Sequence, residues 1–252
     1  MEFHDQIVLV CGTVNRLGQL IAEAALKRGA LKVVLVGNIA STSQFQQSGH
    51  GELICVPDDA LDDPQGSIDS IKQFGRIDTV VNLVTLADSP PISPSNSTST
   101  TSELISVFDA VSRRTARVVE ATRELLQRSR PHGVIVNVGW FSSEAGRSMP
   151  VAASAAFASL ETLTHLHAKE LAPHIRVNSV FSEELAATSQ PPFTPAHDAY
   201  YIRSPDESIG PILFLASSAA RHITGTVLTA NRGRRLGFGN FSNQNEGISQ
   251  PT

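Results

Sequence analysis

Short runs rich in Val, Ile and Leu alternate with longer amphipathic segments along this 252-residue chain. The predicted strands are Ile7–Val10, Lys32–Val36, Leu53–Val56, Thr79–Leu83, Gly133–Val138, Arg176–Val180 and Thr226–Leu228. The predicted helices are Gly18–Arg28, Gln65–Phe74, Ser102–Arg128, Pro150–Leu171 and Asp206–Ala216. Strands that alternate with helices form parallel sheets, and nearly continuous apolar strands are typical of sheets covered on both faces. The sequence therefore predicts an α/β fold with one doubly wound parallel sheet of about seven strands.

The composition supports a single domain with one large core. Hydrophobic residues make up 41% of the chain and charged residues 17%, which is typical of a globular protein. We expect residues 1–236 to form this domain and the polar residues 237–252 to form a C-terminal tail. The net charge of -4 provides no long-range attraction to nucleic acid or to an anionic membrane. Small, roughly neutral molecules are the expected partners.

The sequence shows neither a targeting signal nor a metal-binding motif. Its first residues lead directly into an apolar strand, and no apolar run approaches about 18 residues, so a cytoplasmic protein is expected. Cys11 and Cys55 each end a predicted strand, which indicates two buried thiols and no disulfide framework. His165 and His167 lie two residues apart on a predicted helix and face different sides, so no metal site is expected.

Several short motifs occur in a fixed order from Gln6 to Gly233. They are Cys11-Gly-Thr-Val-Asn-Arg-Leu-Gly18, Phe74-Gly-Arg-Ile-Asp-Thr-Val-Val-Asn82, Val134-Ile-Val-Asn-Val138, Lys169-Glu-Leu-Ala-Pro173, Ile175-Arg-Val-Asn178, Phe214-Leu-Ala-Ser217 and Ile223-Thr-Gly225. In this order they resemble the short-chain dehydrogenase/reductase family. The resemblance implies a Rossmann-like fold, and in that family the fold supports hydride transfer with a dinucleotide.

The resemblance breaks down at the residues that carry the family's chemistry. The family's acid is a Tyr four residues before a Lys, whereas the only tyrosines here, Tyr200 and Tyr201, are not followed by a Lys at that spacing. Ala153 and Phe157 occupy the positions of that Tyr and Lys, and Trp140 occupies the position of the family's catalytic Ser in the ungapped register. Ser142 and Ser143, followed by Ala145-Gly146, resemble the family's Ser-Ser-x-Ala-Gly and supply the Ser if the loop carries an insertion. The sequence therefore predicts a divergent member without the Ser, Tyr and Lys of the family.

The glycine-rich loop of the family is also altered. Gly12 and Gly18 keep its spacing, but Arg16 replaces the middle glycine. Two interpretations are open: Arg16 projects over a phosphate, or it fills the dinucleotide cleft. By resemblance, Asn82 belongs to the same site. Gly37, at the end of the second predicted strand, indicates no preference between NAD and NADP.

Four residues predict an apolar, aromatic pocket in place of the nicotinamide site: Trp140, Phe141, Ala153 and Phe157. Such a pocket suits an apolar or aromatic metabolite. The candidate acid, base and hydroxyl groups come from loops expected after the strands: Ser143, Glu144, Glu183, His197 and Tyr201. A carboxylate in an apolar pocket acquires a raised pKa and can act as acid or base. The His197 segment is the place where an imidazole and phenols cluster.

Three hypotheses follow for the function. The preferred one is a non-redox enzyme, such as a cyclase, isomerase or dehydratase, that needs no cofactor because its pocket orients the substrate. The second is a catalytically silent subunit or binding module, and the third is an NAD(P)-dependent oxidoreductase in which Tyr201 or His197 supplies the proton. The family resemblance implies a homo-oligomer, a dimer or a tetramer, and leaves open a hetero-oligomer with an active subunit.

Overall fold

The computed structural model describes residues 2–12, 16–37, 51–56, 71–85, 100–129, 132–143, 151–185 and 207–230. Its strands form one 7-stranded parallel sheet in the order β3-β2-β1-β4-β5-β6-β7. They are β1 (Ile7–Gly12), β2 (Lys32–Val36), β3 (Glu52–Val56), β4 (Thr79–Thr85), β5 (Gly133–Ser143), β6 (Ile175–Leu185) and β7 (Val227–Ala230). The predicted doubly wound α/β fold is confirmed.

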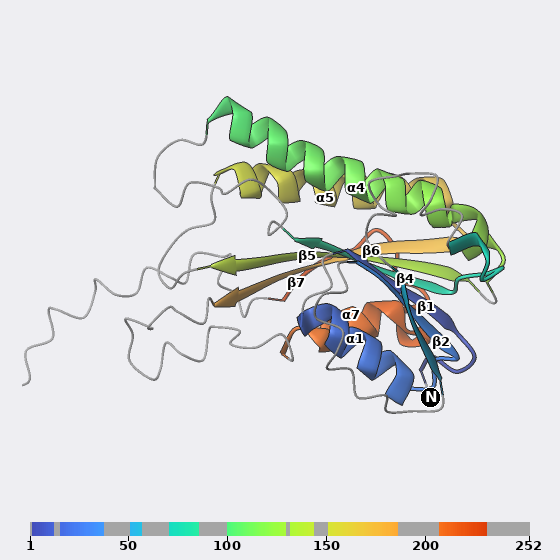
Figure 1. Cartoon of the computed structure of the whole chain (residues 1–252). Coiled ribbons are helices and arrows are strands. Elements are labelled where there is room, and N and C mark those ends of the chain that lie inside the picture. The colour runs from blue at the N-terminus through green and yellow to red at the C-terminus, as the bar shows by residue number, and fades with distance from the viewer. Residues whose placement is uncertain are drawn as a thin grey trace, which may run out of the picture.

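Helices cover both faces of the sheet. They are α1 (Arg16–Lys27), α4 (Thr101–Gln127), α5 (Val151–Leu171) and α7 (Ile209–Ala216). Figure 1 shows α4 and α5 side by side over one face, and α1 and α7 under the other. The apolar core is divided in the same way, because one cluster of buried residues packs against α1 and α7 and two others pack against α4 and α5.

Strands β5 and β6 extend five residues beyond their predicted ends. The two strands remain paired in register from Gly133–Ile175 to Ser143–Leu185. Trp140, Phe141 and Ser143 therefore lie in β5, and Glu183 lies in β6, whereas the sequence had placed all four in loops. The loop assignment was wrong because backbone pairing between these two strands continues after their Val-rich pattern ends.

The other elements lie close to their predicted bounds. Helix α4 begins with a capping box, in which the Thr100 hydroxyl accepts from the Glu103 backbone N–H and the Glu103 carboxylate accepts from the Thr100 N–H. Of the predicted helix Gln65–Phe74, only the part from residue 71 is among the described residues. The residues of the predicted C-terminal tail lie outside them. None of the helices in the described parts is both long enough and apolar enough to span a membrane.

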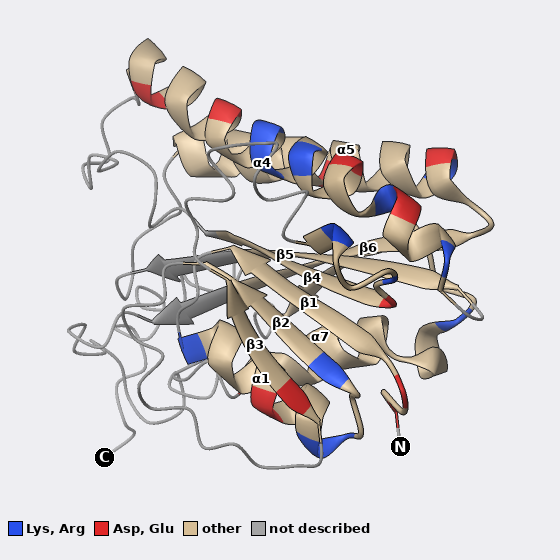
Figure 2. Ribbon diagram, turned by 45° about the vertical axis from the view of Figure 1, so that its right-hand side comes forward, with Lys and Arg blue, Asp and Glu red and all other residues tan. Residues whose placement is uncertain are grey.

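Two side-chain contacts join the parallel helices α4 and α5. The Ser112 and Ser159 hydroxyls lie 3.1 Å apart, and Arg123 Nη1 lies 2.7 Å from Glu170 Oε1. Charged side chains of both signs follow the length of α4, whereas the central strands carry few (Figure 2). The helix pair thus presents a mixed, solvated outer surface over a sheet whose interior is apolar.

Candidate active site

The direction in which successive strands are added to the sheet reverses between β1 and β4. The candidate site lies at the carboxyl ends of these two neighbouring strands. β1 pairs with β2 on one side and with β4 on the other, and all three run in the same direction. In open parallel sheets of this kind, ligands bind outside the carboxyl ends of the strands at such a reversal. The predicted residues Gly12, Arg16 and Gly18 all lie at or just after the carboxyl end of β1.

Gly12 is required by the approach of β4. Its φ angle is +118°, a conformation that side chains rarely adopt, and a Cβ atom there would lie 2.2 Å from the Leu83 carbonyl oxygen. The chain then enters α1, in which Gly18 is buried. The absence of a side chain at Gly12 therefore lets β1 end in close contact with β4.

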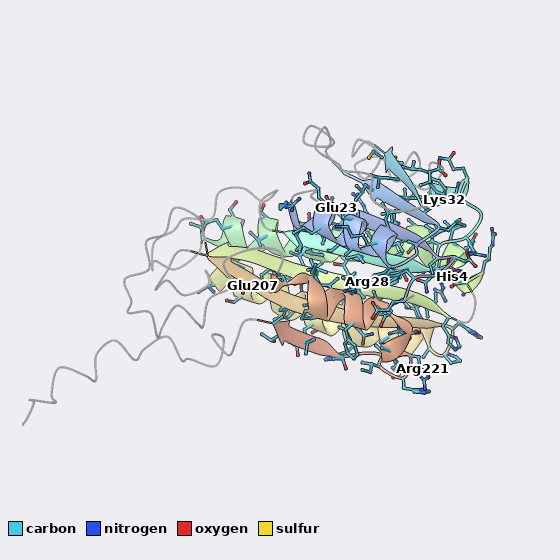
Figure 3. All side chains as sticks on the ribbon, turned by 90° about the horizontal axis from the view of Figure 1, so that it is seen from below. His4, Glu23, Arg28, Lys32, Glu207 and Arg221 are labelled. Atoms are coloured by element: carbon cyan, nitrogen blue, oxygen red, sulfur yellow. The ribbon has the colours of Figure 1, made fainter. Side chains whose placement is uncertain are left out.

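The Arg16 side chain is exposed and contacts another residue of α1. It is 56% exposed, and its Nη1 lies 3.9 Å from Oε1 of Glu23, seven residues further along α1. Figure 3 shows Glu23 on the face of the molecule that carries α1 and α7. The contact with Glu23 holds the exposed guanidinium beside α1, and both interpretations of Arg16 stay predictions.

Asn82 belongs to a row of buried polar groups that crosses the sheet. Its side-chain Nδ2 donates to Asn137 Oδ1 at 3.0 Å, and its Oδ1 lies 3.9 Å from the Cys11 thiol. The row continues through a 3.4 Å hydrogen bond from Asn137 to Thr164 on α5, and from Thr164 to the Ser179 hydroxyl. All of these residues are at most 2% exposed. Asn82 thus ties the strands to each other and to α5.

Ala153 and Phe157 are enclosed by the protein. Ala153 is 0% exposed and Phe157 is 3% exposed, on the inner side of α5. The Phe157 ring lies 5.5 Å from the Phe181 ring at an angle of 39°. Both rings lie over Gly139 of β5, where an added Cβ would come within 2.8 Å of Phe181 and 3.1 Å of Phe157. At the position of the family's Lys, this chain therefore has an aromatic ring packed into the core.

The predicted acid and base groups are only partly within the described structure. Glu144, His197 and Tyr201 lie outside the described residues. Ser143 ends β5, in register with Leu185, and Glu183 pairs in register with Phe141. These register positions place Ser143 and Glu183 at the carboxyl edge of the sheet, and their catalytic roles stay predictions. Within the described ranges, no group of three or more His, Cys, Asp or Glu residues could hold a metal ion.

Two features of this edge were missed from the sequence. Glu23 was not identified as a partner of Arg16, although its spacing of seven residues along a helix places both on one face. The buried hydroxyls of Ser182 and Ser208 lie 2.6 Å apart, between the end of β6 and the start of α7. No motif marked this pair, because the two residues are distant in the sequence and meet only in the folded chain.

The two cysteines differ in their surroundings. Cys11 is 2% exposed, as expected, whereas Cys55 of β3 is only partly buried. Burial nevertheless raises the pKa of the Cys55 thiol, so the protonated form is favoured. Neither cysteine forms a disulfide bond.

The fold and this edge define a doubly wound α/β protein of the dinucleotide-binding type. A family model described as enoyl-(acyl carrier protein) reductase matches residues 12–234. The chain belongs to the short-chain dehydrogenase/reductase family.

Known relatives agree with this assignment. The chain is 27% identical to peroxisomal 2,4-dienoyl-CoA reductase [(3E)-enoyl-CoA-producing] of Pongo abelii, over 94% of this chain and 86% of the relative. A solved short chain dehydrogenase from Leptospira borgpetersenii with bound NAD+ covers 92% of this chain and 93% of its own, with 22% identity and a TM-score of 0.72. A solved short chain dehydrogenase/reductase family protein is 26% identical, covers 94% of this chain and 100% of its own, and has a TM-score of 0.69.

These findings correct the preferred functional hypothesis. The expectation of a cyclase, isomerase or dehydratase was wrong, because the matching family model and the named relative are both reductases. The expectation that no cofactor is required was wrong for the same reason, since members of this family are dinucleotide-dependent oxidoreductases. The absence of the Tyr-x-x-x-Lys motif, Trp140 at the ungapped position of the Ser and the change at Arg16 therefore do not exclude redox chemistry.

Proposed function

We propose that this protein is an NAD(P)-dependent oxidoreductase that reduces a carbon–carbon double bond conjugated to a thioester. The observation that carries the proposal is the match of residues 12–234 to enoyl-(acyl carrier protein) reductase. The 2,4-dienoyl-CoA reductase relative supports the same substrate class. The proposal takes up the oxidoreductase alternative that the sequence left open.

The described residues fit the phosphate end of a dinucleotide. Gly12 ends β1 with the φ of +118° that a tight turn needs, and α1 starts at Arg16. The first turn of α1, which lies wholly within the described residues, contains no acidic side chain. A helix N-terminus with a nearby exposed guanidinium stabilises an anion. These residues would hold the pyrophosphate, and Arg16 would exchange its 3.9 Å contact with Glu23 for it.

The choice of an enoyl thioester explains why the chain can function without a Tyr-x-x-x-Lys motif. When bound, the reduced dinucleotide supplies a hydride to the substrate. In a ketone the oxygen must take up a proton as the hydride arrives, so an adjacent acid is needed. In a conjugated thioester the negative charge is spread over the enolate, and the proton finally joins carbon. The protein must then stabilise an oxygen by hydrogen bonds and admit one proton.

We propose that this chain lacks the family's Ser, Tyr and Lys functions and uses Tyr201 or His197 to deliver the proton. Tyr201 is one of only two tyrosines in the chain, and His197 precedes it by four residues. Ser143 is the proposed hydrogen-bond donor to the enolate oxygen, and Glu183 is a proposed acid or base, since their strand positions lie at the carboxyl edge. Trp140 and Phe141, at the end of β5, are proposed to contact the acyl chain.

The first experiment measures NADPH and NADH oxidation by the purified protein with a 2,4-dienoyl-CoA, an enoyl-CoA and a ketone substrate. We expect turnover of a thioester and little turnover of the ketone. Y201F and H197Q are compared with Y200F, which removes the neighbouring phenol as a matched control. Loss of a proton donor lowers the rate by about 100-fold or more. Absence of dinucleotide binding, or turnover of the ketone alone, would contradict the proposal.

We also propose that the protein is a homo-oligomer that pairs through α4 and α5. Four large apolar side chains on these helices are at least half exposed: Ile105 (64%), Phe108 (50%), Val151 (60%) and Leu166 (57%). Large apolar side chains exposed on one pair of neighbouring helices support an interface there, together with the oligomeric state that the family resemblance implies. Sedimentation equilibrium should give a mass above that of one 26.9 kDa chain, and F108E should shift it toward the monomer. A monomeric wild type would refute this part.

A further inference from the structure

We propose that the buried hydroxyls of Ser182 and Ser208 form a positioning pair for the active site. The pair anchors the carboxyl ends of β5 and β6 to α7 and thereby fixes the site groups that these strand ends carry. The inference rests on the proposed function, in which Ser143 and Glu183 act on the thioester. Its basis is a buried contact between two distant segments of the chain and the pattern of strand pairing around that contact.

The two hydroxyls lie in the interior of the protein, and one donates a hydrogen bond to the other. Their oxygen atoms are 2.6 Å apart, and both residues are buried. Ser182 follows Val180 by two residues on β6, so the two side chains share one face of the sheet. Val180 belongs to the apolar cluster that contains Ile212 and Leu213 of α7. A buried hydroxyl without a partner is costly, so each of these serines stabilises the other.

Ser208 makes this contact without capping its own helix. It is the N-cap residue of α7, a position at which a serine side chain usually accepts from a backbone N–H of the first turn. Thr100 caps α4 in this way, and Ser217 caps the short helix Ser218–Ala220, whereas Ser208 makes no side-chain capping bond. Its hydroxyl therefore stabilises the junction of β6 and α7 and not the helix terminus.

Strands β5 and β6 continue beyond the level of this contact. Ser182 pairs in register with Trp140 of β5 and with Ala230 of β7, and the pairing of β4 with β5 also reaches Trp140. At the next levels, up to Ser143 and Leu185, the register pairs within the described residues join β5 to β6 alone. Two paired strands are marginally stable by themselves. The hydroxyl pair lies at the base of this two-stranded extension.

The extension carries groups that are proposed to act on the thioester. Glu183 directly follows Ser182, and Ser143 is the last residue of β5. A misplacement of about 1 Å at a reacting group can lower a rate by about 100-fold. The proposed phosphate end of the dinucleotide site lies at β1 and α1, and β4 and β5 separate β1 from β6. Loss of the hydroxyl pair should therefore slow the reaction and leave dinucleotide binding unchanged.

The test compares S182A, S208A and the double variant S182A/S208A with wild type. Each protein is assayed for turnover of a 2,4-dienoyl-CoA, for NADPH and NADH affinity by calorimetric titration, and for stability by urea unfolding. S217A is the matched control, because Ser217 is buried at the opposite end of α7, where its hydroxyl donates to the Phe214 carbonyl and accepts from the Ala219 N–H. S182T retains a hydroxyl at the same position and tests for rescue.

We expect kcat to fall about ten- to hundredfold in each single alanine variant, with dinucleotide affinity unchanged. Stability and activity should then separate in the double variant. Removal of both hydroxyls leaves neither of them buried without a partner, so stability should return toward that of wild type, whereas kcat should stay as low as in the single variants. S182T should keep most of the activity, and S217A should be less stable with kcat unchanged.

Activity that follows stability in every variant would overturn the inference, because the pair would then be a part of the core without a positioning role. An equal loss of dinucleotide affinity would also overturn it. Hydrogen–deuterium exchange of the backbone amides at residues 141–143 and 183–185 gives a readout that does not depend on activity. If wild type reduces no thioester, the proposed function fails, and faster exchange in S182A than in S217A would still support the anchoring; equal exchange would overturn it.

Discussion

Replacing Phe157 by alanine would determine whether this residue belongs to the core or to a substrate pocket. Its side chain is 3% exposed and packs in one cluster with Val84, Val111, Leu160 and Phe181. A fully buried Phe changed to Ala costs about 3–5 kcal/mol of unfolding free energy, because apolar contact is lost and a cavity remains. The contact between the Phe157 and Phe181 rings is part of that cost, at about 0.5–1.5 kcal/mol. We therefore expect F157A to be destabilised by about 4 kcal/mol.

Urea unfolding followed by far-ultraviolet circular dichroism measures this change, provided that the slope of unfolding free energy against urea concentration is the same in the variant and in wild type. F214A is the control, because Phe214 on α7 is 43% exposed and its removal should cost less than about 1 kcal/mol. A double-mutant cycle with F181L isolates the contact between the two rings. A loss below about 1 kcal/mol for F157A would refute the core assignment and favour the pocket that the sequence predicted.

Three further substitutions test other parts of the argument. G12A should destabilise the fold by more than about 2 kcal/mol in thermal or urea unfolding, since the left-handed φ and the Leu83 carbonyl at 2.2 Å exclude a Cβ; unchanged stability would contradict this. R176M should cost about 2–4 kcal/mol, because buried Arg176 donates to three backbone carbonyls around the end of α7; a loss within error would show that these bonds are replaceable. Burial lowers the pKa of His167 from its ordinary value of 6.5, against an opposing effect of Glu170, so the folded state binds this proton less readily than the unfolded state. Stability should therefore be fully present above pH 6.5 and fall as the pH drops below it, and H167Q should flatten that fall; an equal pH dependence in both proteins would exclude the effect.

The strands could be predicted because the apolar pattern that identifies each strand lies within its own residues. A parallel strand between two helical layers must be apolar on both faces, so Val8–Val10 or Val33–Val36 is recognisable without any knowledge of its neighbours. The last five residues of β5 and β6 could not be found in this way. There the apolar pattern stops, and the strands continue because each supplies the hydrogen-bond partners of the other. Pairing between distant segments leaves no periodic signal in either one.

In the candidate site, too, the residue identities can be read from the sequence, whereas the side-chain positions depend on other residues of the folded chain. The change from Gly to Arg at position 16 is visible in the sequence, but the direction of its side chain depends on Glu23. Likewise, Phe157 can be recognised at the position of the family's Lys. Whether its ring lines a pocket or fills the core depends on Gly139 and Phe181, which approach it only after β5, β6 and α5 have packed.

The loss of a proton donor does not imply the loss of the cofactor, because different segments build the two parts of the site. The proposed phosphate end depends on β1, Gly12 and the first turn of α1, where Gly12 lies against Leu83 of β4. The positions of the family's Tyr and Lys lie on α5, on the opposite face of the sheet. The buried row from Asn82 through Asn137 to Thr164 connects the sheet to α5, so the position of α5 does not depend on Ala153 or Phe157 alone. Substitutions on α5 can therefore change the source of the proton while dinucleotide binding persists. For this reason, membership of the family is a better guide to the reaction class than the absence of the Tyr at its usual position.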